Sequence, residues 1–302
     1  MKTEFSEELI RDIKDKRELR ALDEDFIVQK LEAFWKDKRY EREKKLAIEK
    51  LNSSKTYKQF AKSREHDFLI KHVRAELRKV YGAFILEQYA KKDKILKRLE
   101  KAIAAHDEHS IISINTELLK LHKSTNERLG HYERLYEQIF EYADSNYKNK
   151  KYIFLDLACG LNPISTNFFI NNIKKYYASD ISSQDCEFIE KYFNIMKIDG
   201  DVFPMDLADE KNYGKLSKIK CDICFIFKAL DGIERVERNI TEKLLKAIDT
   251  KYFAITFPTL SLGGKREIKE HRRLWLEKLF DKLGLKWEKT LIDNELLYMV
   301  EK

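Results

Sequence analysis

The sequence predicts an α/β protein with an open, Rossmann-like sheet of seven strands that ends in an antiparallel hairpin and follows an all-helical N-terminal region. Three observations lead to this prediction. The first 129 of the 302 residues contain one glycine and no proline, and their apolar residues recur at helical spacing. From Lys151 onward, short apolar runs alternate with amphipathic stretches, which is typical of parallel strands joined by helical crossovers.

The N-terminal region is expected to consist of solvated helices that are each buried along one face. Residues 1–118 are assigned to a basic, all-helical domain, and residues 119–302 to the α/β domain. Residues 51–101 hold 14 Lys and Arg against 6 Asp and Glu, which suggests a cationic surface for a polyanion such as RNA. An ordinary solvated helix surface is the alternative. The candidate RNA contacts on this surface are Lys71, Arg74 and Arg78.

Seven apolar runs in the second part of the chain are the candidate strands. The last two are separated by only three residues, so we expect them to pair as an antiparallel hairpin. Pro204 in the third run removes a backbone donor, which predicts that this strand lies at an edge of the sheet. Seven strands with a terminal hairpin suit a methyltransferase-type sheet better than a dinucleotide-binding one. The runs are 152–157, 175–179, 201–205, 222–227, 252–257, 287–292 and 296–300.

Composition excludes several classes of protein. No apolar run approaches the roughly 18 residues of a membrane span, and the chain start lacks the apolar core of a signal peptide, so a cytoplasmic location is expected.

The four cysteines are expected to be reduced thiols. Cys221 and Cys224 are expected to pack in the core, because no second cysteine pair or histidine cluster accompanies them. The seven histidines show no metal-ligand spacing, so no metal site is expected, and nothing indicates an oligomer.

The sharpest local signal is the first predicted strand, which runs through Asp156 into the small residues Ala158, Cys159 and Gly160 and then into an expected helix. Small residues at the carboxyl end of a strand allow backbone amides to approach a ligand. The turn lacks the spaced glycines and the lysine of phosphate-binding loops. A cofactor without phosphates, such as S-adenosylmethionine (SAM), fits better. An ordinary strand-to-helix turn is the alternative.

Two further carboxylates follow the next two predicted strands. Asp180 comes twenty residues after Gly160, the spacing at which a carboxylate accepts hydrogen bonds from ribose hydroxyls. A helix-capping aspartate is the alternative. Asp206 ends the third strand, where it would accept from an adenine amino group while Leu207 packs on the ring.

Five distinctive strings run through the second part of the chain: HKSTNERL (122–129), LDLACGLNP (155–163), FKAL (227–230), FPTLSLGG (257–264) and NELLY (294–298). Together, and in this order, they resemble the aminoglycoside-resistance type of 16S rRNA guanine-N7 methyltransferase. The resemblance covers roughly residues 119–302. Residues 1–118 show no motif that matches.

The resemblance implies a class I SAM-dependent methyltransferase whose N-terminal helices dock on the small ribosomal subunit or its 16S rRNA. Arg128 would pair with the carboxylate of SAM, for which a guanidinium fork is suited. The cofactor-binding residues would be Arg128, Asp156, Ala158, Gly160, Asp180, Ile181, Asp206 and Leu207. Lys228 and Glu234 would lie near the methyl-transfer site. The segment from Thr259 to Gly264, with Thr259 and Ser261 as contacts, would face the target base.

Methylation of guanine N7 requires no general base, because N7 carries an in-plane lone pair and no proton. The predicted activity is therefore direct in-line methyl transfer to guanine N7 in 16S rRNA. The alternatives are a non-catalytic ribosome-binding or assembly protein with the same fold, and a methyltransferase that acts on tRNA or on a small molecule. Aminoglycoside resistance does not follow from the sequence, since a housekeeping RNA modifier would keep every cofactor residue.

Overall fold

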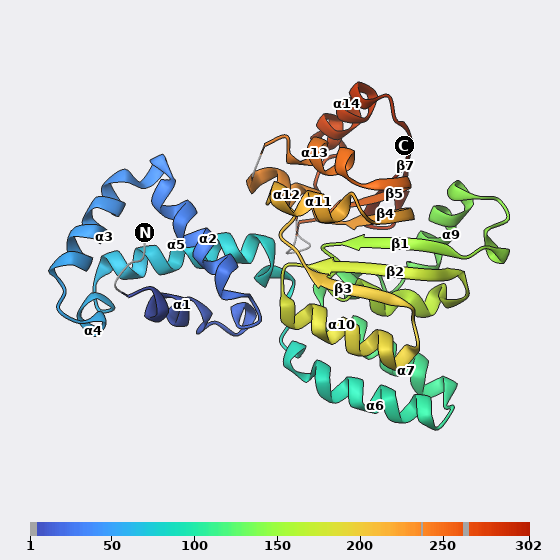
Figure 1. The fold of residues 1–302 in the computed structure, drawn as a ribbon, viewed down its shortest axis with the longest axis horizontal. Coiled ribbons are helices and arrows are strands. Elements are labelled where there is room, and N and C mark those ends of the chain that lie inside the picture. The colour runs from blue at the N-terminus through green and yellow to red at the C-terminus, as the bar shows by residue number, and fades with distance from the viewer. Residues whose placement is uncertain (1–4, 237, 262–265) are drawn as a thin grey trace. The chain divides into compact units, whose positions relative to one another are not determined.

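The computed structural model describes residues 5–236, 238–261 and 266–302, which form two compact units, Met1–Ala83 and Phe84–Lys302 (Figure 1). This boundary differs from the one predicted after residue 118. The reason is that α6 (Lys92–Ala104) and α7 (Glu108–Leu119) pack in the second unit, α6 against α10 and α7 against the 3-10 helix that follows β1.

The first unit is helical, as its lack of helix-breaking residues predicts. Its central helix is α5, which contacts α1, α2 and α3. Leu69, Ile70, Val73 and Leu77 of α5 recur at helical spacing and are buried in these contacts. The α-helices are α1 (Ser6–Lys14), α2 (Glu24–Lys36), α3 (Glu41–Ser53), α4 (Tyr57–Phe60) and α5 (Arg64–Val80).

The second unit is built on a seven-stranded sheet with the order β3-β2-β1-β4-β5-β7-β6. The predicted fold class is confirmed: β1 to β5 are parallel, and β6 and β7 form the antiparallel hairpin. Pro204 ends β3, which is an edge strand as its proline predicts. The strands are β1 (Tyr152–Leu157), β2 (Ile173–Asp180), β3 (Gly200–Pro204), β4 (Lys220–Phe227), β5 (Asp249–Pro258), β6 (Lys286–Ile292) and β7 (Glu295–Glu301).

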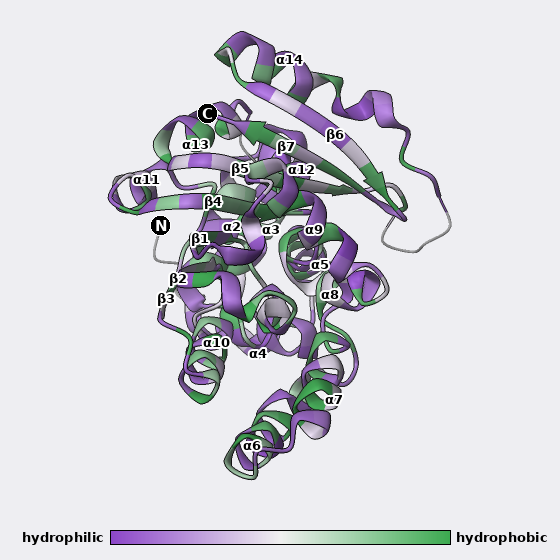
Figure 2. Ribbon diagram, turned by 90° about the vertical axis from the view of Figure 1, so that its right-hand side faces the viewer, coloured by the Kyte–Doolittle hydropathy of each residue, from purple (hydrophilic) through white to green (hydrophobic). Residues whose placement is uncertain are grey.

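Helices cover both faces of this sheet, and alternate strand residues point into two separate cores. Phe154 and Phe225 belong to the core with α6, α7, α9 and α10, whereas Leu155 and Cys224 belong to the core with α11, α13 and α14. Figure 2 shows the contrast between the largely apolar β7 and the more hydrophilic edge strand β6. The covering helices are α8 (Lys123–Arg128), α9 (Tyr132–Ala143), α10 (Ser183–Met196), α11 (Tyr213–Leu216), α12 (Leu230–Val236), α13 (Ile240–Ala247) and α14 (Leu274–Leu283).

The last residue of the chain caps a helix. The ammonium group of Lys302 donates to the carbonyl oxygens of Leu245, Lys246 and Ile248 at 2.9, 3.3 and 2.5 Å, where α13 ends. A cation at a helix C-terminus satisfies carbonyls that have no intrahelical partner and interacts favourably with the helix dipole.

Replacing Lys302 with methionine is expected to lower the free energy of unfolding by about 1–2 kcal/mol, because three carbonyl groups lose a charged donor while the aliphatic chain is kept. Urea denaturation measures this change. Lys286→Met is the matched control, since Lys286 is exposed on β6 and makes one surface ion pair at 3.8 Å, with Glu301. Equal effects of the two substitutions would contradict the capping role.

Candidate functional site

The candidate site lies where β1, β2 and β4 end, because the carboxyl ends of parallel strands meet at one edge of the sheet. The backbone there is unusual at three positions: Ala158, Gly160 and Lys228 all have positive φ angles, of 52°, 50° and 56°. For a residue with a side chain, this conformation costs on the order of 1–3 kcal/mol and is concentrated at functional sites. We call this region, together with the residues that contact it, the strand-end site.

Asp180, the last residue of β2, holds the turn after β1. Its carboxylate accepts hydrogen bonds from the backbone N–H groups of Gly160 (2.8 Å), Ile181 (2.8 Å) and Ser182 (3.3 Å). Burial, together with the charge of Asp185, raises the pKa of Asp180 to about 6, and the three backbone donors oppose this rise. At neutral pH the side chain is therefore a carboxylate at the junction of β1 and β2.

Asp156 on β1 is the second buried carboxyl group of the strand-end site. It accepts hydrogen bonds from the side-chain amide of Asn162 at 2.9 Å and from the Tyr176 hydroxyl at 2.8 Å. Burial raises the pKa of Asp156 to about 7, although these two hydrogen bonds and the charge of Arg128 oppose the rise. Asp156 therefore titrates near neutral pH.

The helix expected after this turn is a 3-10 helix, Asn162–Phe168. The hydroxyl groups of Ser165 and Thr166 donate to the carbonyl oxygens three residues earlier, those of Asn162 (2.6 Å) and Pro163 (2.8 Å). Such local side-chain bonds compete with the α-helical pattern and favour a tighter turn.

His122 covers the glycine turn. A Cβ atom added at Gly160 would lie 3.0–3.5 Å from the His122 imidazole, which stacks on the ring of Phe84 with a distance of 5.7 Å between centroids. Burial lowers the pKa of His122 to about 4, although the charge of Asp185 opposes this shift. The imidazole is therefore neutral at physiological pH, and it would have to shift slightly to accommodate a side chain at position 160.

The low pKa of His122 predicts a loss of stability in acid. His122 binds a proton more weakly in the native state than in the unfolded chain. The free energy of unfolding is therefore highest above pH 6.5 and decreases as the pH falls towards 4. Relative to a His122→Gln variant, the wild type is expected to lose about 3 kcal/mol between pH 7 and pH 4. Urea denaturation of both proteins across this range tests the prediction, and parallel curves would contradict it.

Arg128, at the end of α8, is fully buried in an ion pair with Glu295 at the start of β7. Its Nε donates to the two carboxylate oxygens of Glu295 at 2.8 and 2.9 Å, and its Nη2 lies 2.8 Å from Oε1. The same Nη2 donates to the Thr256 hydroxyl at 3.3 Å, and the guanidinium group lies over the ring of Phe227, 4.7 Å from its centroid. Arg128 thereby joins α8 to β4, β5 and β7.

Lys228 completes this network. Its ammonium group lies 3.1 Å from Glu295 and 2.9 Å from Glu127, and its backbone N–H donates to the carbonyl oxygen of Thr256 at 2.9 Å. Burial alone would raise the pKa of Glu295, but the charges of Arg128 and Lys228 outweigh it and hold that pKa well below its usual range. This network therefore contains two buried cations and one buried carboxylate, that of Glu295, which stays ionised.

Three other predicted residues of the second unit, Glu234, Asp206 and Leu207, make contacts with residues nearby in the sequence or pack in the core. Glu234 accepts hydrogen bonds from Asn239 and Thr241 at the start of α13, the contacts of a helix-capping side chain. Asp206 accepts from the N–H of Ala208, and Leu207 is buried in the core beneath β3. The binding and catalytic roles predicted for these residues stay predictions.

The segment predicted to face the target base is described in part, because residues 262–265 lie outside the described ranges. Thr259 donates its backbone N–H to Asn294 and accepts at its carbonyl oxygen from Ile268, while Ser261 accepts from the N–H of Arg266. Further along, the buried Arg273 pairs with Asp231 of α12 at 2.8 and 3.0 Å. Arg273 thus ties this segment to the helix that follows Lys228.

Of the cations predicted to contact RNA in the first unit, two are held by intramolecular partners. Arg74 donates to the carbonyl oxygens of Asp12 and Ile13 at the end of α1, and Arg78 lies 2.6 Å from Glu18. Lys71 is exposed on α5. The RNA contacts predicted for these three residues stay predictions.

Sequence patterns missed Glu295, Glu127, His122 and Thr256 as members of the strand-end site. Glu295 precedes an apolar run and has the appearance of a turn residue, and Thr256 is one of many residues in a buried strand. The only signal was that three of them fall inside the strings that carry the family resemblance.

The residues of the strand-end site fit SAM in their chemistry. Asp180 is a carboxylate next to a glycine turn, which suits ribose hydroxyls. Three buried polar atoms, Asp156 Oδ1, Ser179 Oγ and His122 Nδ1, have no hydrogen-bond partner among the described residues, and buried polar atoms normally have one. Arg128 fits less simply, because Glu295 and Thr256 bind two of its nitrogens, so its contact with the SAM carboxylate stays a prediction.

The described parts of the chain contain neither a candidate membrane-spanning helix nor a candidate metal-binding cluster. None of the described helices has the length and hydropathy that a membrane crossing requires. Within the described ranges, no group of three or more His, Cys, Asp or Glu side chains is arranged to hold a metal ion.

All four cysteines are buried free thiols, and Cys221 and Cys224 pack in the core as expected.

Comparison with known proteins supports the resemblance. The 16S rRNA (guanine(1405)-N(7))-methyltransferase of Frankia casuarinae is 25% identical over 235 residues, which are 77% of this chain and 80% of the relative. The protein of the same name from Serratia marcescens is 28% identical over 244 residues, with coverage of 77% and 83%.

Solved structures share the fold. The 16S rRNA methyltransferase RmtF, crystallised with S-adenosyl-L-homocysteine, superposes with a TM-score of 0.69 at 20% identity and covers 99% of this chain and 98% of its own. The 16S rRNA methylase ArmA has a TM-score of 0.50 at 27% identity over 67% of this chain and 97% of its own. The family described as "Ribosomal RNA methyltransferase (FmrO)" matches residues 43–299, so the family resemblance is confirmed and this chain belongs to the FmrO family of ribosomal RNA methyltransferases.

Proposed function

We propose that this protein uses SAM to methylate N7 of a guanine in the 16S rRNA of the small ribosomal subunit. The observation that carries the proposal is the family match over residues 43–299, which spans both structural units. The relatives are named for guanine 1405 of 16S rRNA, which makes this the first nucleotide to test. We also propose that the protein binds the small ribosomal subunit itself and that it is located in the cytoplasm.

The strand-end site would hold the cofactor as follows. The carboxylate of Asp180 would accept from the ribose hydroxyls, and Ala158 and Gly160, in the turn after β1, would contact the methionine part. Asp206 and Leu207 recognise the adenine. Asp156 and Ile181 would provide further contacts, and the guanidinium group of Arg128 would pair with the carboxylate of SAM.

When bound, SAM supplies a methyl group on a positively charged sulfur, which a lone pair can attack directly. The task of the protein is then alignment, because guanine N7 has no proton to remove. Holding both reactants in near-attack geometry contributes about 7–11 kcal/mol at best. The buried network of Arg128, Glu295 and Lys228 joins α8 to three strands, so it fixes the ends of the elements that surround the reacting atoms.

The target guanine would have to leave its stack to reach the methyl group, at a cost of a few kcal/mol. Thr259 and Ser261, in the segment after β5, are the proposed contacts of the extruded base, and the basic first unit supplies contacts with the RNA backbone. Lys228 and Glu234 are the polar residues proposed to lie near the methyl-transfer site.

The experiment that tests this function is incubation of the purified protein with radiolabelled SAM and 30S subunits, followed by mapping of 7-methylguanine with borohydride and aniline. We expect label in 16S rRNA and cleavage at one guanine. Free 16S rRNA and tRNA are the parallel substrates. Label on tRNA alone would redirect the substrate assignment, and SAM binding without transfer to any RNA would favour a non-catalytic ribosome-binding protein.

A further inference from the structure

A buried ion pair that involves none of the residues predicted from the sequence lies beside the strand-end site. It joins Lys92, the first residue of α6, to Asp185 in the first turn of α10, and these two helices pack against each other in the second unit (Figure 1). The exposed fractions of the two side chains are 11% and 2%. The ammonium group also lies over the rings of Tyr89 and Phe188, 4.6 and 5.1 Å from their centroids. Lys92 is therefore held by one carboxylate and two aromatic faces.

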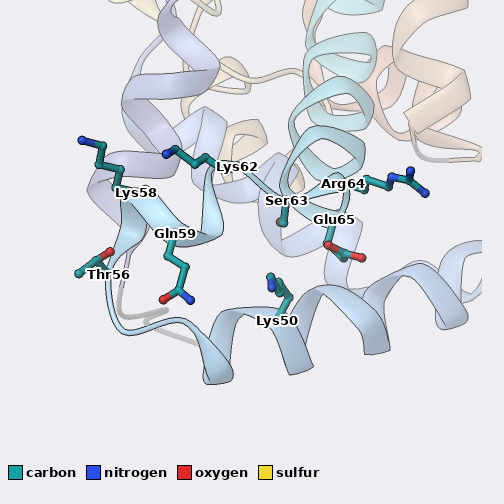
Figure 3. Close-up of a pocket in the computed structure, with 8 residues that line it drawn as sticks. All are labelled: Lys50, Thr56, Lys58, Gln59, Lys62, Ser63, Arg64 and Glu65. Atoms are coloured by element: carbon teal, nitrogen blue, oxygen red, sulfur yellow. The ribbon is translucent and has the colours of Figure 1, made fainter.

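The position of Lys92 is unfavourable for a lysine on local grounds. Lysine side chains are seldom buried unless they are paired, and a cation in the first turn of a helix opposes the helix dipole. By comparison, Lys58 and Lys62, which line an open hollow in the first unit, are exposed to solvent (Figure 3). The burial of Lys92 thus depends on its partner, Asp185.

Asp185 belongs to the same short segment as Asp180. Its backbone N–H donates to the hydroxyl oxygen of Ser182, the N-cap of α10, at 3.2 Å, and the N–H of Ser182 in turn donates to the Asp180 carboxylate at 3.3 Å. That carboxylate also holds the turn at Gly160. The ion pair therefore fastens α6 to the segment that carries the acceptor proposed for the ribose of SAM.

Neighbouring carboxyl groups make the charge of Asp180 costly. Burial raises the pKa of Asp180 most, and the charge of Asp185 raises it further. The charge of Asp180 in turn adds to the burial that raises the pKa of Asp156 on β1. The ammonium group of Lys92 offsets the charge of one member of this group of three carboxyl side chains.

The other elements around Asp180 supply no compensating cation within the described structure. Pro204, which pairs with Asp180 from β3, has no titratable side chain. The titratable side chains that lie around Asp180 come from α10, β1, the turn after β1 and the segment before α8, and they are Asp185, Asp156, Cys159 and His122. The cation nearest to this group in the contact network is thus Lys92, which reaches it through Asp185.

We propose that Lys92 is a positioning residue of the cofactor site, an inference that rests on the proposed function. Its ammonium group neutralises Asp185 and thereby allows Asp180 to remain a carboxylate in a buried position. Asp180 then meets the ribose hydroxyls of SAM as a charged acceptor at neutral pH. Lys92 acts through Asp185 and needs no contact with SAM, with RNA or with the reacting atoms.

The variant that tests this role is Lys92→Met, which removes the charge and keeps an unbranched side chain. Without the ammonium group, the carboxyl groups of Asp180 and Asp185 repel each other, and the pair takes up a proton at a higher pH. We expect SAM binding at pH 7 to weaken about tenfold, and the pH at which affinity falls to rise by about one unit. Calorimetric titrations with SAM between pH 5 and pH 9 measure both changes.

Titration of the Asp180 carboxyl group in the cofactor-free protein gives a readout that does not depend on SAM. Carbon-13 NMR follows the carboxyl carbons, and the signal of Asp180 is identified by its absence from the spectrum of Asp180→Asn. Its midpoint should rise by about one unit in Lys92→Met. Lys94→Met is the matched control and should leave the midpoint unchanged, because Lys94 is exposed on the same helix. An unchanged midpoint in Lys92→Met would overturn the inference.

A double variant separates the charge of Lys92 from its packing. If Lys92 acts by neutralising Asp185, the Lys92→Met, Asp185→Asn protein should bind SAM within about threefold of the wild type. A double variant that binds SAM about tenfold more weakly would show that packing matters rather than charge, and the inference would be wrong. This comparison remains decisive if Lys92→Met does not fold, because the double variant leaves no unpaired charge at the two positions.

Failure of the proposed function gives a different result. If the wild type binds SAM with this dependence on Lys92 but transfers no methyl group to 16S rRNA, the inference stands and the proposed function fails. If the wild type methylates 16S rRNA and Lys92→Met changes neither SAM affinity nor the Asp180 midpoint, the inference fails alone. In the active enzyme, Lys92→Met should raise the KM for SAM and leave kcat at saturation unchanged, because Lys92 acts on cofactor binding.

Discussion

Replacing Glu295 with glutamine is expected to lower the free energy of unfolding by about 3–5 kcal/mol. Glu295 is fully buried and is the shared counter-charge of Arg128 and Lys228. Glutamine has nearly the same shape, so packing is preserved and the change isolates the charge. Lys228 keeps Glu127 as a partner, but the guanidinium group of Arg128 would be left buried without a carboxylate.

Urea denaturation of the Glu295→Gln protein at pH 7 measures this loss. Glu288→Gln on the neighbouring edge strand is the matched control, because Glu288 is exposed and should change stability by less than about 0.5 kcal/mol. If the two substitutions have the same effect, Glu295 does not compensate the buried cations. A second substitution, Arg128→Met, made together with Glu295→Gln, should recover part of the loss, since it removes the uncompensated charge.

Much of the fold follows from the sequence, because the strands are determined by local patterns. Each predicted run coincides with a strand to within a few residues, and β1 matches at both ends. Pro204 predicted an edge strand from the chemistry of a single residue, since proline has no N–H to donate to a neighbour. The short gap after residue 292 predicted the hairpin for a similarly local reason.

Features that depend on contacts between distant residues could not be predicted in this way. Glu295 lies 167 positions after Arg128, and no spacing rule relates a turn residue to a cation on a helix in another part of the chain. The compact units divide after Ala83 rather than after residue 118, because α6 and α7, which resemble the first helices in composition, pack against the α/β part.

Net charge gave a similarly incomplete view of the first unit. The basic excess of residues 51–101 is real, but composition does not tell which cations are neutralised by partners in the folded chain. Arg74, Arg78 and Lys71 were predicted from the same basic stretch, but the fold engages the two arginines with partners in their own unit and leaves Lys71 exposed. The structure, rather than the charge count, distinguishes them.

Replacing Asp180 with asparagine is expected to weaken SAM binding by about tenfold to a hundredfold. A carboxylate accepts both ribose hydroxyl protons, whereas an amide offers one acceptor oxygen, and a hydrogen bond to a charged group is worth about 1.5–3 kcal/mol. The same substitution removes an acceptor from the N–H groups of Gly160, Ile181 and Ser182, so the turn after β1 loses part of its support.

The pKa of Asp180, raised by burial to about 6, adds a pH dependence to the same prediction. Above pH 6 the group is a carboxylate that accepts hydrogen bonds, and below pH 6 its protonated form has lost part of that capacity, so SAM affinity should fall as the solution becomes more acidic. Calorimetric titrations with SAM between pH 5 and pH 8 should show this fall in the wild type and a flatter profile in Asp180→Asn. Asp201→Asn is the control, because Asp201 lies on the adjacent strand in an exposed ion pair with Lys175. An Asp180→Asn protein that binds SAM as tightly as the control would remove Asp180 from the cofactor site, and with it the main polar contact proposed there.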